Sequence, residues 1–306
     1  MLTIFTVPKA FKGHINVIQQ NAIKSWSMLE PKCQVILAGN DEGTDQASSD
    51  LGVEHIPNLT RNEFGTPLLD SAYQQVEDAA RFPFICYVNA DVILMNDFTQ
   101  AVQRVLRQSQ WFLMTAQRWN LSVTELLDFN QGWQEHLLKN VSSNGSLAHS
   151  TGIDFWVYPK GMLYDMPPLA VGRMAIECWC LYKARHMQAD LIDSTEAVIS
   201  VHQNHDYAHH SDGHRGIGIS IEAERNRDMV GGKNYFFTIK DRTHILSTTS
   251  FRRTRDCWKA WRGLRTIRVL NPTMPIPLKL ATTALNGVID LTRDSLITVR
   301  NQILRR

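Results

Sequence analysis

Residues 84–98 read Phe-Ile-Cys-Tyr-Val-Asn-Ala-Asp-Val-Ile-Leu-Met-Asn-Asp-Phe. The stretch begins with an apolar run, which is followed by the polar residues Asn89 and Asp91. A continuous apolar run of this length is typical of a central parallel strand that is covered on both faces. In α/β folds, ligands bind at the carboxyl ends of such strands. A carboxylate buried there needs a cation or hydrogen bonds to offset its desolvation, so Asp91 is a candidate ligand-binding residue. The alternative is that Asp91 caps the turn after the strand.

The rest of the first half alternates strand-like runs with helical periodicity. Apolar residues recur at helical spacing from Ile15 to Leu29 and from Phe98 to Leu106, and Pro67 occupies a position typical of a first helical turn. Further helices are expected at 123–138 and 174–186. The expected strands are Leu2–Val7, Gln34–Ala38, Val53–Ile56, Phe84–Val88, Trp111–Ala116, Ile153–Tyr158, Asp190–Asp193 and Ala197–Val201. This alternation predicts an α/β fold with a mainly parallel central sheet flanked by helices.

Candidate donor-binding residues follow four of the expected strands, and most of them are polar. They are Pro8 and Lys9, then Asn40 and Asp41, then Arg61 and Asn62, and finally Asn89, Ala90 and Asp91. Because the carboxyl ends of parallel strands meet at one edge of a sheet, we expect these loops to surround a single crevice.

The side chains around this crevice suit a nucleoside diphosphate. Asn40 and Asp41 can hydrogen-bond a base or a ribose, and the cations Lys9 and Arg61 can bind phosphate oxygens. Asp91 can hold a divalent cation, Mg²⁺ or Mn²⁺, that bridges two phosphates. An added imidazole favours Mn²⁺, and His202, which directly follows an expected strand, is the candidate for it.

Cysteine usage and hydropathy indicate the cellular compartment. The five cysteines are scattered and odd in number, which favours a reducing compartment over a disulfide framework. No apolar run approaches the ~20 residues that span a bilayer, and the amino terminus lacks the pattern of a secretory signal. We therefore expect a cytoplasmic protein.

The net charge of +2 is unevenly distributed along the chain. Residues 251–306 hold twelve Lys or Arg against three Asp, a net charge of +9, whereas residues 1–250 carry a net charge of −7. We expect a catalytic domain at 1–250 and a basic helical extension at 251–306. Within the extension, Trp258 and Trp261 lie among arginines, a pattern typical of helices on anionic membranes such as the inner face of the cell membrane. Alternatively, the tryptophans pack on the catalytic domain; no nucleic-acid-binding motif is present.

The motif Tyr87-Val88-Asn89-Ala90-Asp91-Val92-Ile93-Leu94 resembles the Asp-x-Asp motif of GT-A fold, nucleotide-sugar-dependent glycosyltransferases, with Asn in the first acidic position. The resemblance covers about residues 2–245 and includes three further segments. They are Thr151-Gly152-Ile153-Asp154-Phe155, Gly172-Arg173 through Ile176-Glu177-Cys178-Trp179, and Val201-His202-Gln203-Asn204-His205-Asp206-Tyr207. The chain looks most like a little-described branch of that fold. Asn89 leaves one carboxylate fewer for a metal.

This resemblance implies transfer of a hexosyl or pentosyl group from a nucleoside-diphosphate sugar to a hydroxyl of a glycan, lipid or small-molecule acceptor. Glu177 occupies the position that resembles the family's acceptor-side acid, so it is the expected general base, and such a base fits inversion at the sugar. Asp154 is the second candidate for a catalytic acid or base. The structural alternatives are an exposed helical acid for Glu177, and for Asp154 a cap or a bridge to Arg173.

Five histidines lie in the expected long loop of residues 202–218. We expect His202 to reach the donor-bound cation and the others to belong to a lid that closes over the donor. Two other functions stay open at this point: a His-dependent metallohydrolase, and a glycan- or lipid-binding module without enzymatic activity.

Overall fold

The computed structural model describes residues 1–205, 219–232, 235–254 and 257–284, with the side chains of 257–261 left out of the description. Contacts divide the chain into two compact units, Met1–Thr254 and Arg255–Arg306. The strands are β1 (Thr3–Thr6), β2 (Gln34–Ala38), β3 (Glu54–Ile56), β4 (Phe84–Val88), β5 (Val92–Ile93), β6 (Phe112–Thr115), β7 (Trp119–Leu121), β8 (Ser146–Leu147), β9 (Phe155–Pro159), β10 (Asp190–Glu196), β11 (Val201–Gln203), β12 (His244–Ser247) and β13 (Phe251–Arg253). The helices are α1 (Gly13–Ser27), α2 (Thr44–Leu51), α3 (Leu69–Ala79), α4 (Asn96–Leu106), α5 (Trp133–Asn144), α6 (Ile176–His186), α8 (Ile221–Met229), the short η2 (Ile239–Asp241) and α9 (Cys257–Leu270).

The main sheet has nine strands in the order β13-β12-β10-β6-β9-β4-β1-β2-β3. The pairs β4-β1, β1-β2, β2-β3, β6-β10 and β10-β12 are parallel. The predicted α/β fold with a mainly parallel central sheet flanked by helices is therefore confirmed. Strand β9 runs antiparallel between β4 and β6, so the residues that precede it lie beside the carboxyl end of β4.

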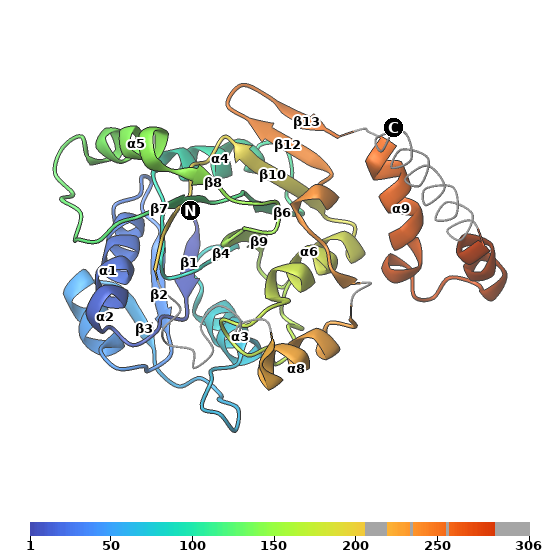
Figure 1. Cartoon of the computed structure of the whole chain (residues 1–306), viewed down its shortest axis with the longest axis horizontal. Helices are drawn as coiled ribbons and strands as arrows, with labels where there is room; N and C mark the ends of the chain where they lie inside the picture. Colours follow the sequence, from blue (N-terminus) through green and yellow to red (C-terminus); the bar gives the residue numbers. More distant parts are fainter. Residues whose placement is uncertain (206–218, 233–234, 255–256, 285–306) are drawn as a thin grey trace, which may run out of the picture. The chain divides into compact units, whose positions relative to one another are not determined.

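Helices cover both faces of this sheet (Figure 1). Side chains of α1 and α4, including Trp26 and Phe98, form one core cluster with Ile4 of β1 and Val88 of β4. On the opposite face, Tyr73 of α3 contacts the rings of Phe5 and Tyr87, and α6 packs on β6 and β10. Burial of β4 on both sides is what its uninterrupted apolar sequence predicts.

A second sheet, in the order β5-β11-β7-β8, lies at the carboxyl end of β4. Strand β5 directly follows Asp91, and β11 pairs with it in antiparallel register, His202 opposite Val92. A strand from more than a hundred residues later in the chain is thereby brought next to the end of β4.

Two helices begin later than predicted. Helix α5 begins at Trp133 and not at Val123, because residues 123–132 form a loop that Asn21 holds through hydrogen bonds to Glu125 and Leu127. Helix α3 begins at Leu69, because Pro67 and the following residue are engaged in β-bridges. The apolar periodicity of both helices extends into the loops that precede them, so the sequence predicted that the helices begin earlier than they do.

Near the end of the first unit, the observed strands also differ from the predicted ones. Strand β11 begins at Val201 and not at Ala197, and the backbone NH of Ile199 donates to Asp97 instead of to a neighbouring strand. Residues Phe251–Arg253 form β13, an edge strand of the main sheet paired with β12.

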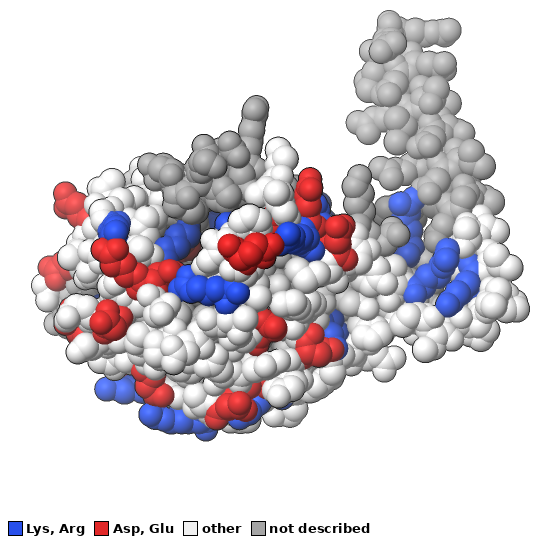
Figure 2. All heavy atoms as spheres, turned by 90° about the horizontal axis from the view of Figure 1, so that it is seen from below, with Lys and Arg blue, Asp and Glu red and all other residues white. Residues whose placement is uncertain are grey.

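The second unit holds α9, and its described residues 257–284 contain five Lys or Arg and no Asp or Glu. Basic side chains are visible on it in Figure 2, whereas the first unit shows a mixture of both charges. The side chains of Trp258 and Trp261 lie outside the described ones. Throughout the described residues, every helix is too short or too polar to cross a bilayer.

Candidate active site

A cavity of about 820 Å³ opens at the edge of the main sheet where the parallel strands end. Its wall contains ten of the predicted site residues. They are Pro8, Lys9, Asp41, Arg61, Asn89, Ala90, Asp91, Asp154, Glu177 and His202. Asn40 and Asn62 do not line the cavity. The carboxyl ends of β1, β2 and β4 thus meet around one crevice, as the strand order requires.

The cation candidate is a cluster of Asp91, His202 and His205, whose ligand atoms lie within 4.8 Å of one another. Asp91 Oδ2 lies 3.1 Å from Nε2 of His205 and 3.7 Å from Nε2 of His202. Asp91 Oδ1 is buried and has no hydrogen-bond partner among the described residues. A buried carboxylate oxygen without a partner is costly, so the residues present fit a divalent cation. One carboxylate and two imidazoles favour Mn²⁺ over Mg²⁺.

Strand register holds this cluster in place. The antiparallel β5-β11 pair sets His202 opposite Val92, next to Asp91 in the chain. The backbone NH and the side-chain amide of Gln203 both donate to the carbonyl oxygen of Asp91, each at 3.1 Å. The sequence analysis named His202 as a candidate ligand and assigned His205 to the lid. The available signal was their three-residue separation, which lets both imidazoles face one point as β11 ends.

The charges around Asp91 oppose the effect of its burial. Burial by itself raises the pKa of a carboxyl group, but His202, His205 and Lys9 together hold the pKa of Asp91 below its ordinary value. Asp91 is therefore ionised at neutral pH.

Lys9 lies in the same cavity as a cation of lowered basicity. Burial lowers the pKa of Lys9, and the nearby Asp91 partly offsets this. Its backbone is fixed by the buried Gln19, which accepts from the NH of Lys9 at 2.7 Å and donates to its carbonyl at 2.9 Å. No hydrogen bond or ion pair joins its ammonium to the described residues. That ammonium is available for an anion in the cavity.

Arg61 is engaged with the protein itself. Its Nη2 donates to Asn40 at 2.8 Å and to Asp41 at 3.1 Å, and its Nη1 donates to the carbonyl of Gly65 at 2.7 Å. These bonds join the loops after β2 and β3. Arg61 lines the cavity with a guanidinium that is already partly neutralised, and Asn40 acts as its anchor.

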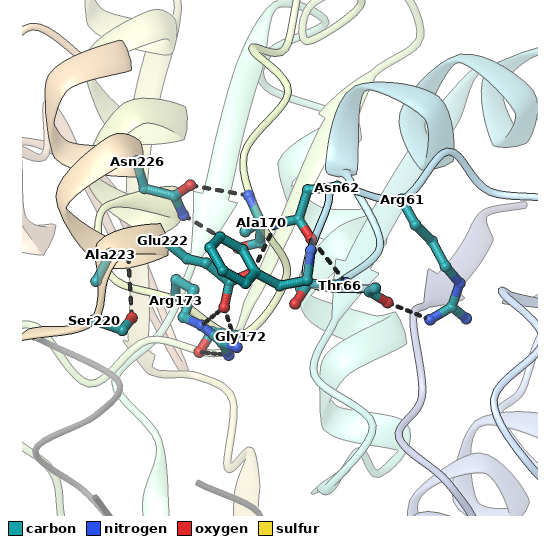
Figure 3. A network of polar contacts seen from close by, with 12 residues as sticks. Arg61, Asn62, Thr66, Ala170, Gly172, Arg173, Ser220, Glu222, Ala223 and Asn226 are labelled. Carbon is teal, nitrogen blue, oxygen red and sulfur yellow. Dashed lines mark hydrogen bonds and ion pairs between the residues drawn. The ribbon is translucent and has the colours of Figure 1, made fainter. Parts of the chain in front are cut away.

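Asn62 belongs to a network that fixes the cavity wall (Figure 3). Its Oδ1 accepts from the backbone NH of Phe64 and of Thr66, and its Nδ2 donates to Glu222 of α8 at 2.7 Å. The second oxygen of Glu222 accepts from Nε and Nη2 of Arg173, at 2.9 and 2.6 Å. Asn62 therefore acts on the cavity through the loop and helix that it joins.

Glu177 also lines the cavity and lies in the first turn of α6. The preceding Ala175 has a left-handed backbone (φ 84°), a conformation that costs free energy in a residue other than glycine and is frequent at functional sites. Burial raises the pKa of Glu177 to about 7, and the Asp154 carboxylate adds to this while Arg118 opposes it. A carboxyl group with this pKa can take up a proton near neutral pH.

Asp154 is buried in an ion pair. Nη1 of Arg118 lies 3.0 and 2.9 Å from its two carboxylate oxygens, and the side-chain amide of Asn89 donates to it at 3.1 Å. The predicted alternative, a bridge to Arg173, is not formed, because Arg173 pairs with Glu222. The sequence analysis missed Arg118, which follows β6 by three residues. The signal was its position after a strand of the same sheet.

No protein-family model matches the sequence of this chain, and no curated protein matches it. Among solved structures, the chain is similar to S. aureus TarS, with a TM-score of 0.45 and 9% identity over 66% of this chain and 36% of that chain. Residues 1–349 of TarS in complex with UDP-GlcNAc give a TM-score of 0.45 and 10% identity, over 67% of this chain and 59% of that one. Glucosyl-3-phosphoglycerate synthase from Mycobacterium tuberculosis, in complex with Mn²⁺, UDP and phosphoglyceric acid, gives 0.45 and 13%, over 76% of this chain and 79% of that one. The chain thus spans 36 to 59% of the TarS chains, and these likenesses concern the fold.

Proposed function

We propose that this chain transfers a sugar from a nucleoside-diphosphate sugar to an acceptor hydroxyl. The observation that carries the proposal is a single cavity that holds two carboxylates with opposite properties. Asp91 is kept ionised beside two imidazoles, and Glu177 has a pKa of about 7. Asp91 suits the binding of a diphosphate through a cation, and Glu177 suits proton transfer.

The donor's diphosphate would lie on the Asp91 side. Asp91, His202 and His205 would hold the cation, which when bound would stabilise negative charge on the leaving diphosphate. The Lys9 ammonium would contact a phosphate oxygen directly, because no hydrogen bond or ion pair joins it to the described residues. The nucleoside would reach towards Asp41, which Arg61 holds in place.

The acceptor would lie on the Glu177 side. The Glu177 carboxylate would take the proton from the attacking hydroxyl, a role that contributes roughly two to four orders of magnitude to rate. A side-chain base that is separate from the cation ligands fits inversion at the sugar. Asp154 is a poor base, because both of its oxygens accept from Arg118.

Thermal-shift measurements with a panel of nucleoside-diphosphate sugars, each with and without Mn²⁺, test this function. A ligand at a hundred times its dissociation constant stabilises a protein by about 2.7 kcal/mol, which a melting curve resolves. We expect stabilisation by at least one sugar nucleotide, larger with Mn²⁺ present. If none of the panel raises the melting temperature with or without the metal, the transferase proposal is wrong.

A His-dependent metallohydrolase is the second candidate, because Asp91, His202 and His205 form a three-residue ligand set without any help from a nucleotide. The two candidates differ in their requirement for Lys9. A Lys9→Ala variant should lose sugar-nucleotide binding in a transferase and keep Mn²⁺ binding in either case. Mn²⁺ binding with no nucleotide response at all favours the hydrolase, and absence of both leaves a glycan- or lipid-binding module.

We further propose that the second unit contacts an anionic membrane surface, which would place the protein on the cytoplasmic face of a bilayer. Its residues 257–284 are basic, and the described side chains of Ile276, Leu278 and Leu280 are 72%, 51% and 65% exposed. Each Lys or Arg near such a surface contributes about 1 kcal/mol of attraction. Apolar side chains beside basic ones suit the headgroup region of a bilayer.

Vesicle flotation with the full chain tests the membrane proposal. We expect flotation with phosphatidylserine vesicles and much less with phosphatidylcholine vesicles. An Ile276→Ser/Leu280→Ser variant should float less, whereas the control Leu126→Ser, which removes an equally exposed leucine from the first unit, should float normally. Equal flotation of both variants, or equal flotation on both lipids, contradicts the proposal.

A further inference from the structure

Asn89 occupies the first acidic position of the Asp-x-Asp motif that this segment resembles. Its contacts explain why an amide, and not a carboxylate, is present there. Its side-chain Nδ2 donates to Asp154 Oδ1 at 3.1 Å, and its backbone NH donates to the Asp154 carbonyl at 2.9 Å. The carbonyl of Asn89 in turn accepts from the NH of Val92 at 3.1 Å. The turn that presents Asp91 to the cavity is therefore tied on one side to Asp154.

This contact exists because β9 is antiparallel to β4. The register pairs Val88 with Phe155, so the residue after β4 meets the residue before β9. Asp154 is 3% exposed and carries a negative charge that Arg118 offsets at 3.0 and 2.9 Å. Arg118 is itself fixed, since its Nε donates to Asn120 at 3.0 Å.

A carboxylate at position 89 would be unfavourable beside Asp154. The amide donor would become an acceptor, and two carboxylates would lie about as far apart as a hydrogen bond, with one guanidinium to offset both. Like charges at such a distance in a buried site repel strongly. A neutral donor at position 89 is therefore what the Asp154–Arg118 pair requires.

We propose that Asp154 and Arg118 are positioning residues that orient Asn89, so that the acid missing from the motif is present directly before β9 instead and the site requires Asn at position 89. The Nδ2 atom of Asn89 is used by Asp154, which leaves its Oδ1 as an acceptor for the donor molecule. Restoring an acid at position 89 would accordingly damage the site. The effect on ligand binding rests on the proposed function, whereas the effect on the unliganded protein does not.

The test compares Asn89→Asp, Asp154→Asn, the exchange Asn89→Asp/Asp154→Asn, and Asn89→Ala. Melting temperatures of the unliganded proteins and affinities for Mn²⁺ and for UDP with Mn²⁺ are measured for each. Asn16→Asp is the matched control, because it adds the same charge to α1 while its Oδ1 can still accept from Gln20. The exchange variant keeps one carboxylate and one amide in contact, with their positions swapped.

We expect Asn89→Asp to lower the melting temperature and to weaken UDP–Mn²⁺ binding at least about tenfold, the equivalent of one pKa unit of interaction energy. The exchange should regain much of both losses, Asn89→Ala should lose less than Asn89→Asp, and the control should match the parent chain. The coupling energy of the cycle then measures the repulsion.

Three results would overturn the inference. They are tighter Mn²⁺ binding by Asn89→Asp at an unchanged melting temperature, equal damage from Asn89→Ala and Asn89→Asp, and an exchange variant no better than Asn89→Asp. If the single variant does not fold, recovery of folding in the exchange variant decides. If the parent chain binds no UDP, the proposed function fails, and the melting temperatures of the unliganded proteins still decide on Asn89.

Discussion

Asp91 and Glu177 are both partly buried carboxylates in the same cavity, yet their environments push their pKa values in opposite directions. Asp91 faces two imidazoles and Lys9, so its charge is stabilised. The charge of Glu177 is disfavoured mainly by burial, and the nearby Asp154 carboxylate adds to this effect. Burial alone would raise both pKa values. The comparison teaches that burial acts on both acids in the same direction, and that the cationic neighbours of Asp91, which Glu177 lacks apart from Arg118, separate the cation-binding role from the proton-accepting role.

Removing the base should have the largest effect. Glu177→Gln keeps the shape of the side chain but cannot accept a proton, so we expect hydrolysis or transfer of a bound sugar nucleotide to fall by about 10²–10⁴-fold. Affinity for UDP with Mn²⁺ should stay close to that of the parent chain. The measurement is the initial rate of nucleoside-diphosphate release, paired with a binding titration.

Glu224→Gln is the control for this change, because Glu224 is an exposed acid in the first turn of α8 and does not line the cavity. Near-normal turnover in Glu177→Gln would remove the base assignment. Loss of nucleotide binding together with turnover would show that Glu177 belongs to the donor side, and the contrast between the two acids would be lost.

Removing the other acid should affect binding first. Asp91→Asn takes away the one carboxylate among the three candidate ligands, so we expect Mn²⁺ affinity to fall by at least about a hundredfold. Nucleotide binding should then no longer respond to Mn²⁺. Titration calorimetry with the metal alone measures the effect, and Asp45→Asn, on the exposed side of α2, is the control. Unchanged Mn²⁺ affinity would contradict the cation role of Asp91.

A smaller effect is expected for the histidine that the sequence analysis missed. His205→Ala leaves Asp91 and His202 in place, and we expect Mn²⁺ affinity to fall by about tenfold. His202→Ala is the matched comparison, since both imidazoles approach the same carboxylate oxygen. If His205→Ala binds Mn²⁺ normally while His202→Ala does not, the cation has one imidazole ligand, as the sequence alone suggested.

The sequence predicted the sheet and the Asp91 end of the cavity better than the Glu177 end. Strand β4 reads as buried on both faces, and its end is a ligand position in any sheet of this kind, so Asp91 could be found without coordinates. The hydrophobic pattern of β9 does not reveal that this strand lies antiparallel between β4 and β6. The contact of Asp154 with Asn89 was therefore not predictable, whereas the spacing of His205 from His202 was a signal that the sequence analysis did not use.

The pKa contrast also makes a prediction for stability, with the smallest expected effect. The pKa of Glu177 is raised from an ordinary value of 4.5 to about 7, so the folded chain holds this proton more tightly than the unfolded chain does. The resulting stabilisation is fully present below pH 4.5 and is lost as the pH rises through about 7, which amounts to at most about 3 kcal/mol.

A Gln at this position cannot ionise, so Glu177→Gln should melt several degrees higher than the parent chain at pH 8 and at a similar temperature at pH 4.5. Melting curves across this range measure the difference, with Glu224→Gln as the control. A difference that stays constant with pH would mean that Glu177 ionises normally, and the two acids of the cavity would then lack the contrast on which their separate roles depend.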